Sequence, residues 1–458
     1  MIFKENSIFN SRYSNQLCGA LAVNIMTLSH GIQLGWLSPM ILFLQSDRSP
    51  LDHSITADES SWIGSCLSLG GLLGNFIFGL LLDKIGRKKT VLLLPIPHII
   101  LWIIVFFATK VEHFYIARIF AGLCGGGIFV CVPIFIAEIS QPRIRGRLGS
   151  FFILALNLGV LCGFVVSSYV DYKLTSCVIV ILPITYVILL WFLNEPPYYL
   201  LRNEMFDEAE KSFKFYCNYK GNSKTEIDNF TKEFNELKQS AENSRQNGGK
   251  LSIKDFTTKQ SMNALGIAFF LMCLNQFCGV FAFINYSSSM FEKTGSKLDP
   301  NINSIILGVV QIIGTYASTI FVDISGRKIL LIISSFGMAF GLTVEAVYEH
   351  YAAIYNLESY NFIPIVSFCF VIFIGSVGVI SISYVVIVEV LPSNIRSIGS
   401  ILTMNVLCIL AFTVLKLFPV AMEYFGLSVV LIFTASFSAL GGIFIILFVP
   451  ETKGKQLE

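Results

Sequence analysis

One charged motif occurs twice in the chain, and its residue types suit ion pairing rather than covalent chemistry. Residues 83–88 read Asp-Lys-Ile-Gly-Arg-Lys and residues 323–328 read Asp-Ile-Ser-Gly-Arg-Lys, each between two long apolar runs. In each copy a carboxylate precedes a guanidinium by four residues, so the two groups attract each other. No connecting segment combines a nucleophile with a base, a phosphate-binding loop or metal-ligand spacing. The motif predicts charge pairing at two equivalent places, and we expect no enzyme.

A second repeated motif can supply partners for the first. Glu138 stands seven residues before Arg145, and Glu389 stands seven residues before Arg396. If the spans ending in these motifs are neighbours, two clusters form, one in each half: Asp83, Arg87, Glu138 and Arg145, then Asp323, Arg327, Glu389 and Arg396. An alternative is that the charges only set topology, since isolated surface ion pairs contribute about 0–1 kcal/mol. The repetition of both motifs favours a gating role.

The composition excludes a soluble multidomain protein. Of the 458 residues, 54% are hydrophobic and only 14% are charged, and the mean hydropathy is +0.70. These values are typical of a membrane protein. A formal net charge of +2 is too small to favour nucleic-acid binding. Most of the eleven cysteines lie in apolar runs without metal-ligand spacing, so we expect buried thiols, no metal site and no cofactor.

Apolar runs long enough to cross a bilayer divide the chain into twelve expected helices. A helix needs about 20 residues to cross the hydrocarbon core. Runs of this size lie at residues 17–44, 60–82, 90–109, 114–138, 147–170, 175–193, 260–290, 302–323, 329–350, 361–388, 397–422 and 427–449. The predicted fold is an all-α membrane protein with twelve transmembrane helices in two pseudo-symmetric six-helix halves.

A long charged segment separates the first six spans from the last six. It predicts an N-terminal half at residues 1–197, a cytoplasmic linker at residues 198–259 and a C-terminal half at residues 260–458. Apolar residues recur at helical spacing in 207–216 and 226–237, which predicts short helices in the linker. Turns rich in Lys and Arg alternate with mixed or acidic ones, and the positive-inside rule places both termini in the cytoplasm. No cleavable signal is expected.

Several further motifs carry a resemblance to a known family. In chain order they are Gly35-Trp-x-Ser-Pro39, Ser61-Trp-x-Gly-Ser65, the turn at residues 79–89, Arg118-x-x-x-Gly122, Pro133-x-Phe-x-x-Glu138 and Pro450-Glu-Thr-Lys-Gly-Lys455. With these motifs the chain resembles the sugar porters of the major facilitator superfamily over almost its whole length, and most resembles the insect trehalose and glucose facilitators. The motifs are specific for the family but not for the sugar.

The resemblance implies a transporter with two six-helix halves around a central cavity. A small-molecule sugar would bind near mid-membrane, and the halves would rock to expose it to each side in turn, which agrees with the internal repeat. The charge clusters would brace the cytoplasmic side while the cavity faces outward and separate when it faces inward. The expected surroundings are the lipids of the plasma membrane. Neither nucleic acid nor an obligate protein partner is expected.

The family's sugar-binding positions are altered in this chain. Span 7 retains Gln276, whereas a second glutamine is Asn275 and a sugar-binding asparagine is Phe281. The glutamine of span 5 is Asn157, and the tryptophan of span 10 is Tyr384. Because an unpaired buried polar group costs about 1–3 kcal/mol, the loss of several amides argues against an unmodified glucose site.

A reduced set of side chains can still bind a polyol. The asparagine of span 8 aligns with Gln311, which remains a donor and acceptor. The residues expected to contact the substrate are Gln276, Asn275, Asn157, Gln311, Tyr286 and Tyr384, with Phe281 against the face of the ring. The alternative for each amide is a hydrogen bond between helices in lipid.

The end of span 6 also departs from the family. Its Pro-Glu-Ser-Pro-Arg is Asn194-Glu-Pro-Pro-Tyr198 here, so the arginine that would join the first cluster is missing. We therefore expect the first cluster to be weaker than the corresponding cluster of its relatives.

The resemblance also bears on the energy source. Ion-coupled members place a proton-exchanging carboxylate in span 1, but residues 24–39 contain neither Asp nor Glu. His30 is the only titratable side chain there, and a lone histidine is more often packed than a proton carrier. We predict facilitative, uncoupled transport of a sugar: trehalose, a hexose or a related polyol. The alternative is a transport-incompetent protein that retains the fold and senses a sugar or binds other proteins.

Overall fold

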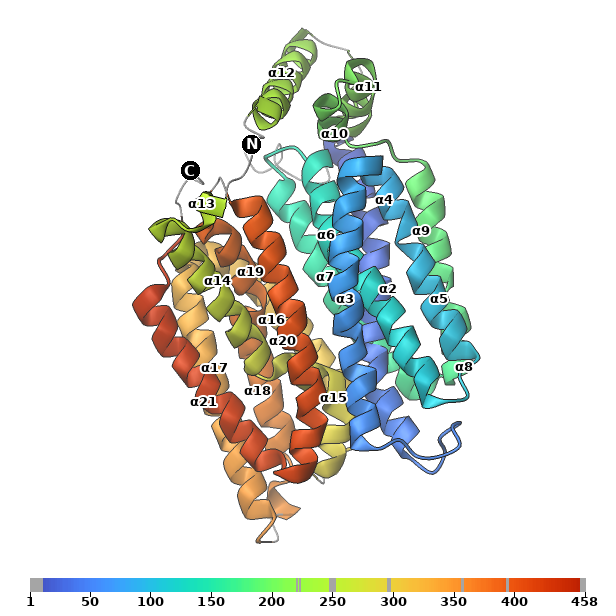
Figure 1. Cartoon of the computed structure of the whole chain (residues 1–458), viewed down its shortest axis with the longest axis vertical. Coiled ribbons are helices and arrows are strands. Elements are labelled where there is room, and N and C mark those ends of the chain that lie inside the picture. Colours follow the sequence, from blue (N-terminus) through green and yellow to red (C-terminus); the bar gives the residue numbers. More distant parts are fainter. Residues whose placement is uncertain are drawn as a thin grey trace.

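The membrane-spanning segments form two groups that stand side by side in the computed structural model (Figure 1). It describes residues 11–219, 221, 224–246, 253–294, 298–355, 358–392 and 395–453. Within these residues, twelve helical segments are long and apolar enough to cross a membrane, which confirms the predicted fold class. The spans of the first half are α2 (Ser14–Gln45), α3 (Ala57–Ile85), α4 with α5 (Arg87–Leu93, Pro95–Phe106), α6 (Val111–Ile139), α7 (Arg145–Tyr169) and α8 with α9 (Tyr172–Ile179, Ile181–Trp191).

The second half repeats this arrangement with six further spans. They are α14 with α15 (Lys259–Phe277, Val280–Lys293), α16 (Pro300–Ser325), α17 (Arg327–Ala352), α18 with α19 (Ile363–Val377, Val379–Val390), α20 (Arg396–Tyr424) and α21 (Leu427–Phe448). Two 3-10 turns, η1 (Ser11–Tyr13) and η2 (Glu358–Tyr360), lie outside the spans.

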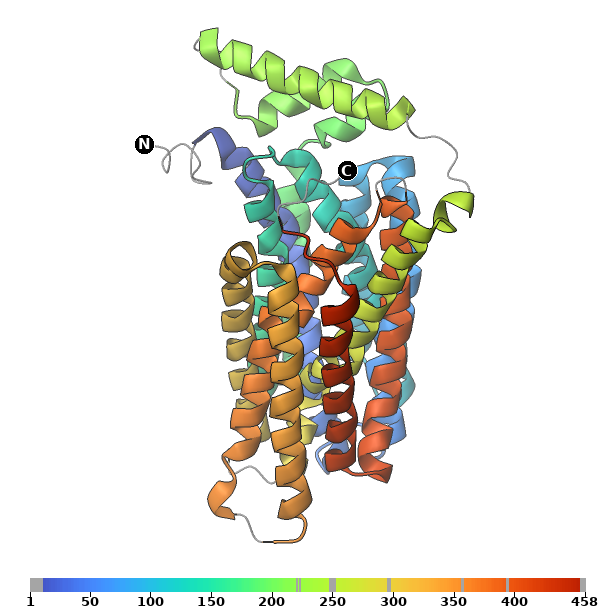
Figure 2. The same cartoon turned by 90° about the vertical axis from the view of Figure 1, so that its left-hand side faces the viewer.

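The linker forms a separate layer of helices at one end of the bundle (Figures 1 and 2). Its elements are α10 (Pro197–Arg202), α11 (Phe206–Tyr216), α12 (Lys224–Gln246) and α13 (Ile253–Phe256). The helices predicted at 207–216 and 226–237 are present as α11 and α12. Glu233 of α12 fastens this layer to the first half, because it accepts hydrogen bonds from Arg12 at 2.8 Å and from Gln141 at 2.7 Å. We call this the linker end and the other the far end.

Small residues bring helices of the first half into direct backbone contact. A Cβ added to Gly122 of α6 would lie 1.8 Å from the Leu67 carbonyl of α3, and one added to Gly31 of α2 would lie 2.2 Å from the Leu156 carbonyl of α7. In lipid, where apolar surface alone gives helices little preference for one another, such close approach supplies much of the packing energy. The glycines of α3 and α6 therefore serve packing.

Four of the described spans are interrupted, and three of the breaks fall at or beside a proline or glycine. Pro95 follows the break between α4 and α5, since proline has no amide hydrogen and is tolerated in a first turn. Gly279 separates α14 from α15 with a φ of 83°, which favours glycine. The break in span 10 occurs at Gly378, between α18 and α19. These breaks lie within spans that line the junction of the two halves or pack beside it.

The halves meet along three helix pairs: α2 with α15, α3 with α20, and α7 with α16. Each pair joins a helix of one half to a helix of the other, as expected for a pseudo-symmetric dimer of halves. Side chains on these six helices therefore lie where the two halves meet.

Candidate functional site

The first charge cluster is a buried ion pair between the start of α4 and the end of α6. Arg87, only 5% exposed, directs its Nε to both carboxylate oxygens of Glu138 at 3.0 Å. Its Nη1 donates to the Leu82 carbonyl at 3.0 Å and lies 3.5 Å from Asp83. The Tyr199 ring covers the guanidinium at 4.6 Å. The buried Arg87 guanidinium therefore has partners on several sides, and these contacts fix the turn at residues 83–88.

Arg145, the fourth predicted member, lies outside this cluster. Its side chain is exposed, and its Nη2 donates to the Ser140 carbonyl at 3.3 Å. Arg202 of α10 approaches Asp83 at 3.5 Å instead. The linker thus supplies a cation where the end of span 6 lacks the family's arginine.

Glu195, which sequence reasoning did not assign a role, caps the start of α4. Its Oε1 accepts hydrogen bonds from the backbone amides of Arg87 and of Lys88, the latter at 3.0 Å. A carboxylate at a helix N-terminus satisfies amides that have no partner within the helix. Burial raises the pKa of the Glu195 carboxyl above its ordinary value, although these amides act in the opposite direction.

The second half contains the equivalent arrangement. Arg327 lies 3.5 Å from Glu389 and donates to the Val322 carbonyl at 3.2 Å. Glu451 accepts from the backbone amides of Arg327 at 3.0 Å and Lys328 at 3.1 Å, as Glu195 does in the first half. The side chains of Asp323 and Arg396 lie outside the described part of the chain.

The pKa of Glu451 is shifted in the opposite direction from that of Glu195. Partial burial acts to raise it, but hydrogen bonds from several backbone amides outweigh this and lower the Glu451 pKa below its ordinary value. A sequence signal for both residues existed, since each follows the last span of its half as Asn-Glu-Pro or Pro-Glu-Thr.

Two predicted substrate-binding amides meet across the junction of the halves. Gln311 of α16 donates to Asn157 of α7 at 3.1 Å, and Asn157 donates to Thr315 at 2.8 Å. Both amides are 6% exposed. They lie near the middle of their helices, at the depth where a substrate between the halves would be enclosed.

Two other predicted amides sit beside the break between α14 and α15. Gln276 donates to Asn275 at 3.1 Å, and Asn275 donates to the Val379 carbonyl of α19 at 3.2 Å. The Oε1 atom of Gln276 is buried and has no hydrogen-bond partner among the described residues. Phe281 and Tyr384 are half-buried at the edge of the same apolar core. Gln276 therefore retains an acceptor that a ligand hydroxyl could satisfy.

Tyr286 is placed at the closed junction of the halves. Its ring is 1% exposed, and its hydroxyl donates to the Leu415 carbonyl of α20 at 2.9 Å. A Cβ on Gly64 of α3 would lie 1.9 Å from this hydroxyl. The glycine of the Ser-Trp-x-Gly-Ser motif therefore admits the tyrosine from the other half.

Further contacts between the halves gather toward the far end. Ser38 of α2 bonds to Ser287 at 2.9 Å and to Ser288 at 3.2 Å on α15. Lys416 of α20 reaches Asp58 of α3 at 2.6 Å. Most hydrogen bonds and ion pairs between described side chains of different halves lie near mid-depth or toward the far end, and Asn75 with Asn405, at 3.4 Å, lies on the linker side of the middle. The Arg87–Glu138 and Arg327–Glu389 ion pairs each lie within one half.

A buried arginine in the first half is paired with an amide. Arg118 of α6 is 1% exposed and donates to Gln33 Oε1 of α2 at 2.6 Å and to the Ile63 carbonyl at 3.1 Å. The Gln33 amide in turn bonds to His30 Nδ1 at 3.0 Å, so His30 is packed within the bundle as expected. No described carboxylate lies within ion-pair distance of Arg118.

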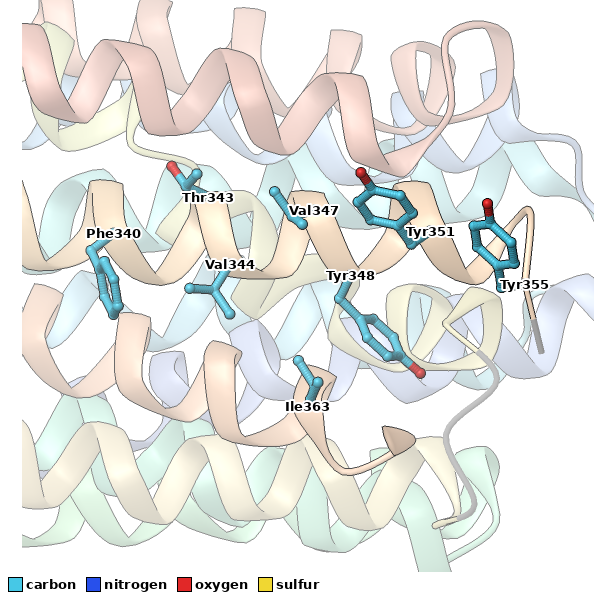
Figure 3. Close-up of a pocket in the computed structure, with 8 residues that line it drawn as sticks. All are labelled: Phe340, Thr343, Val344, Val347, Tyr348, Tyr351, Tyr355 and Ile363. Carbon is cyan, nitrogen blue, oxygen red and sulfur yellow. The ribbon is translucent and has the colours of Figure 1, made fainter. Parts of the chain in front are cut away.

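A groove on the outside of the second half contains none of the predicted substrate residues. It has a volume of about 520 Å³ and lies along α17, with Ile363 of α18 on one side (Figure 3). Its lining is almost entirely apolar: Phe340, Thr343, Val344, Val347, Tyr348, Tyr351, Tyr355 and Ile363. It faces away from the junction of the halves, where the amide pairs lie.

Comparison with known proteins places the chain in a family. The sugar (and other) transporter family matches residues 20–458. The chain belongs to the sugar transporter family. The transporter is 31% identical over 446 residues to the facilitated trehalose transporter Tret1 of Bombyx mori, covering 97% of this chain and 85% of the relative. The Tret1 of Polypedilum vanderplanki is 30% identical, with 97% and 86% covered.

Solved structures share the fold. The inward-open xylose transporter XylE from E. coli superposes with a TM-score of 0.78 at 20% identity, covering 96% of this chain and 97% of that one. XylE bound to 6-bromo-6-deoxy-D-glucose gives 0.77 at 21% identity, covering 97% and 98%. The transporter is thus a multi-pass membrane protein of the sugar porter fold. Membership of a transporter family also confirms that it is not an enzyme.

Proposed function

We propose that this protein lets a sugar equilibrate across the plasma membrane by alternating access, with the linker end and both termini in the cytoplasm. The observation that carries the proposal is the uneven distribution of contacts between the halves. The far end is joined by Ser38 and Lys416, whereas the Arg87–Glu138 and Arg327–Glu389 ion pairs of the linker end each lie within one half. This is the arrangement of a carrier that is closed to the outside and ready to open inward.

The charged turns act as the gate of the linker end. In the inward-facing state Arg87 and Arg327 are held by the glutamates of their own halves. Arg145 is exposed, and its described hydrogen bond goes to the Ser140 backbone carbonyl, so its side chain could reach the second half when that end closes. The clusters would then brace the cytoplasmic side in the outward-facing state.

The substrate we propose is trehalose, a hexose or a related polyol, bound near mid-depth. Curated relatives at 30–31% identity are named as facilitated trehalose transporters. Gln276 offers an unsatisfied acceptor, and the Asn157–Gln311 pair can exchange its mutual hydrogen bond for bonds to sugar hydroxyls. Asn275 and Tyr384 complete the polar set, and Phe281 can cover an apolar ring face. Tyr286 acts in closing the far end.

Transport is proposed to be uncoupled from protons. A proton-exchanging carboxylate is the group that ion-coupled relatives place in span 1, and here the buried Arg118 is paired with the amide of Gln33. An amide cannot release or accept a proton at physiological pH, so the arginine keeps one partner throughout the cycle. Uphill accumulation that collapses with a protonophore would contradict this.

The alternative is a protein that keeps the fold without transport. The observation in its favour is that the amides at the predicted site already bond to one another. Counterflow of labelled trehalose, glucose and fructose in proteoliposomes separates the two functions. We expect counterflow of at least one sugar, and weaker counterflow at low sugar concentration in a Gln276→Leu variant that still folds. If correctly folded protein shows no counterflow of any of the three sugars, the alternative function, sensing without transport, is favoured.

A further inference from the structure

The second half contains two glutamates for which the transport cycle has no use. Glu345 and Glu349 lie one turn apart on α17, toward its far end. Glu345 is 0% exposed, and neither of its carboxyl oxygens has a hydrogen-bond partner among the described residues. Glu349 is half-buried, and its Oε1 is buried without a partner as well. Three carboxyl oxygens are therefore withdrawn from solvent together.

The helices packed against α17 offer no positive charge to balance them. These helices are α16, α18, α19 and α21, and none contains Lys, Arg or His. Their titratable side chains are Tyr316 and Asp323 on α16, Cys369 on α18, and Tyr384 and Glu389 on α19, with none on α21. The Ser367 hydroxyl of α18 is a polar group that faces Glu345.

Cations on α17 itself are badly placed to compensate. Arg327 and Lys328 begin the helix, about 25 Å from Glu345 at 1.5 Å per residue. The His350 side chain is exposed, and its ring contacts the Tyr351 ring. His350 directly follows Glu349 in the helix, so the two side chains point in different directions. The outer face of α17 carries the largely apolar groove of Figure 3, which contributes hydroxyl groups but no cation.

An ionised Glu345 in this setting would be strongly unfavourable. A carboxylate within a membrane span costs several kcal/mol when no cation compensates it, and two carboxylates one turn apart repel each other. A metal cation such as calcium requires about six to eight oxygen ligands, more than these carboxyls and one hydroxyl supply. The smallest ligand that removes the charge is a proton, which also allows the carboxyl to donate a hydrogen bond to Ser367.

We propose that Glu345 is a proton-binding site inside the second half, filled from the medium at the far end by way of Glu349. Glu349 lies in the last full turn of α17, between Glu345 and the helix end at Ala352, so it provides the polar step along the route. The bound proton stabilises the packing of α17 on α18 and α21. The site is separate from the Arg118–Gln33 pair of the first half and does not depend on the proposed sugar transport.

Thermal unfolding of the purified transporter at a series of pH values tests the site. The native state holds the proton that the unfolded chain releases, so stability falls as pH rises above the range in which an exposed glutamate ionises, about pH 4–5. The wild type is expected to lose several degrees of Tm toward alkaline pH relative to Glu345→Gln, which cannot release a proton. Glu292→Gln, a change at an exposed glutamate, is the matched control and should follow the wild type.

A parallel pH dependence in wild type and Glu345→Gln would overturn the proposal. A metal cation in the site would also overturn the proposal. It would show as a rise in the wild-type Tm when sodium replaces choline at equal ionic strength, with no such rise in Glu345→Gln. Infrared spectroscopy gives a second measurement if Glu345→Gln does not fold. The wild type should show a protonated-carboxyl band at neutral pH. Glu349→Gln should show the band too, but as the pH is raised the band should disappear at a lower pH than in the wild type, because the neighbouring negative charge is gone. Absence of the band contradicts the site.

Discussion

At the scale of single residues, the partner of Arg118 bears directly on energy coupling. The guanidinium is buried and bound by Gln33 Oε1 at 2.6 Å. An amide and a carboxylate of nearly equal size differ here in one property, the ability to exchange a proton. The inference of uncoupled transport therefore depends on one functional group.

Replacing Gln33 with glutamate should introduce proton sensitivity. In Gln33→Glu the new carboxylate would pair with Arg118 and exchange protons as access alternates, so sugar uptake should depend on pH more steeply than in the wild type. Gln33→Leu is the control, because it removes the charge-assisted hydrogen bond, worth about 1.5–3 kcal/mol, without adding a titratable group. Initial uptake rates in proteoliposomes over a range of pH measure the effect. Identical profiles for Gln33→Glu and wild type would contradict it.

Removal of the free acceptor of Gln276 should weaken substrate binding. If a sugar hydroxyl donates to Gln276 Oε1, Gln276→Leu loses about 0.5–1.5 kcal/mol, a rise in KM of about 2- to 12-fold. Asn24→Leu is a matched control, since Asn24 is also a buried amide whose oxygen has no partner among the described residues, and it lies on α2 outside the predicted substrate set. Uptake kinetics at equal surface expression decide the matter. An unchanged KM in Gln276→Leu would place the sugar elsewhere.

At the scale of elements, one helix in each half is capped at its N-terminus by a carboxylate from a residue more than 100 positions later in the chain. Glu195 caps α4 and Glu451 caps α17, and the two differ in how they bind. Glu195 accepts both amides through Oε1, whereas Glu451 uses Oε1 for Arg327 and Oε2 for Lys328. The two caps should therefore respond differently to loss of one carboxylate oxygen.

Glutamine should replace Glu195 better than it replaces Glu451. Glu195→Gln keeps the oxygen that accepts both amides, but Glu451→Gln turns one acceptor into a donor and should cost about 0.5–2 kcal/mol, the range for a lost helix cap. Thermal unfolding at neutral pH compares the two. A larger loss for Glu195→Gln would show that its charge matters more than its hydrogen-bond geometry.

The Glu451 cap should also depend on pH. Its pKa is lowered in the folded state, so the stability it contributes is present above the ordinary glutamate pKa of about 4.3 and is lost as pH falls below it. The difference in Tm between wild type and Glu451→Gln should therefore shrink on acidification below about pH 4.3. A difference that stays constant in that range would contradict the assignment.

At the scale of the whole molecule, the closed far end and the charged linker end should oppose each other. Lys416 bonds to Asp58 and Ser61, and lies over the Trp62 ring at 4.3 Å. The Lys416 side chain is 20% exposed and that of Asp58 is 67% exposed, so solvent screens the pair. This contact joins the halves directly and has to break whenever the far end opens.

Changes at the two ends should shift the carrier in opposite directions. Lys416→Met removes a pair worth about 0.2–1 kcal/mol and should raise the outward-facing population by up to about five-fold. Glu389→Gln weakens the opposite gate and should favour the inward-facing state. A cysteine introduced at buried Ser65, labelled from the far side, reports both shifts. Equal labelling in the two variants would show that these charges set the membrane topology and do not control the opening of either end.

The sequence by itself determined the span count, the doubled architecture and the family. Those properties follow from local composition: apolar runs of membrane length, basic turns and motifs repeated at fixed spacing, each of which lies within a short segment. The positions of Arg87 and Glu138 could also be paired correctly, because both motifs end neighbouring spans. The same reasoning located Gln276 but could not tell that Asn157 would bond Gln311.

Only the tertiary structure decided which partner each polar side chain takes. Arg145 was expected in the first cluster and lies outside it, whereas Glu195 and Glu451 join their clusters from the ends of distant spans. Within a bilayer a buried polar group bonds to whatever acceptor the helix packing brings near, and that packing depends on glycine contacts spread over many helices. Spacing along the chain carries no record of such contacts, so Gln33, Lys416 and the isolated Glu345 emerged only from the folded molecule.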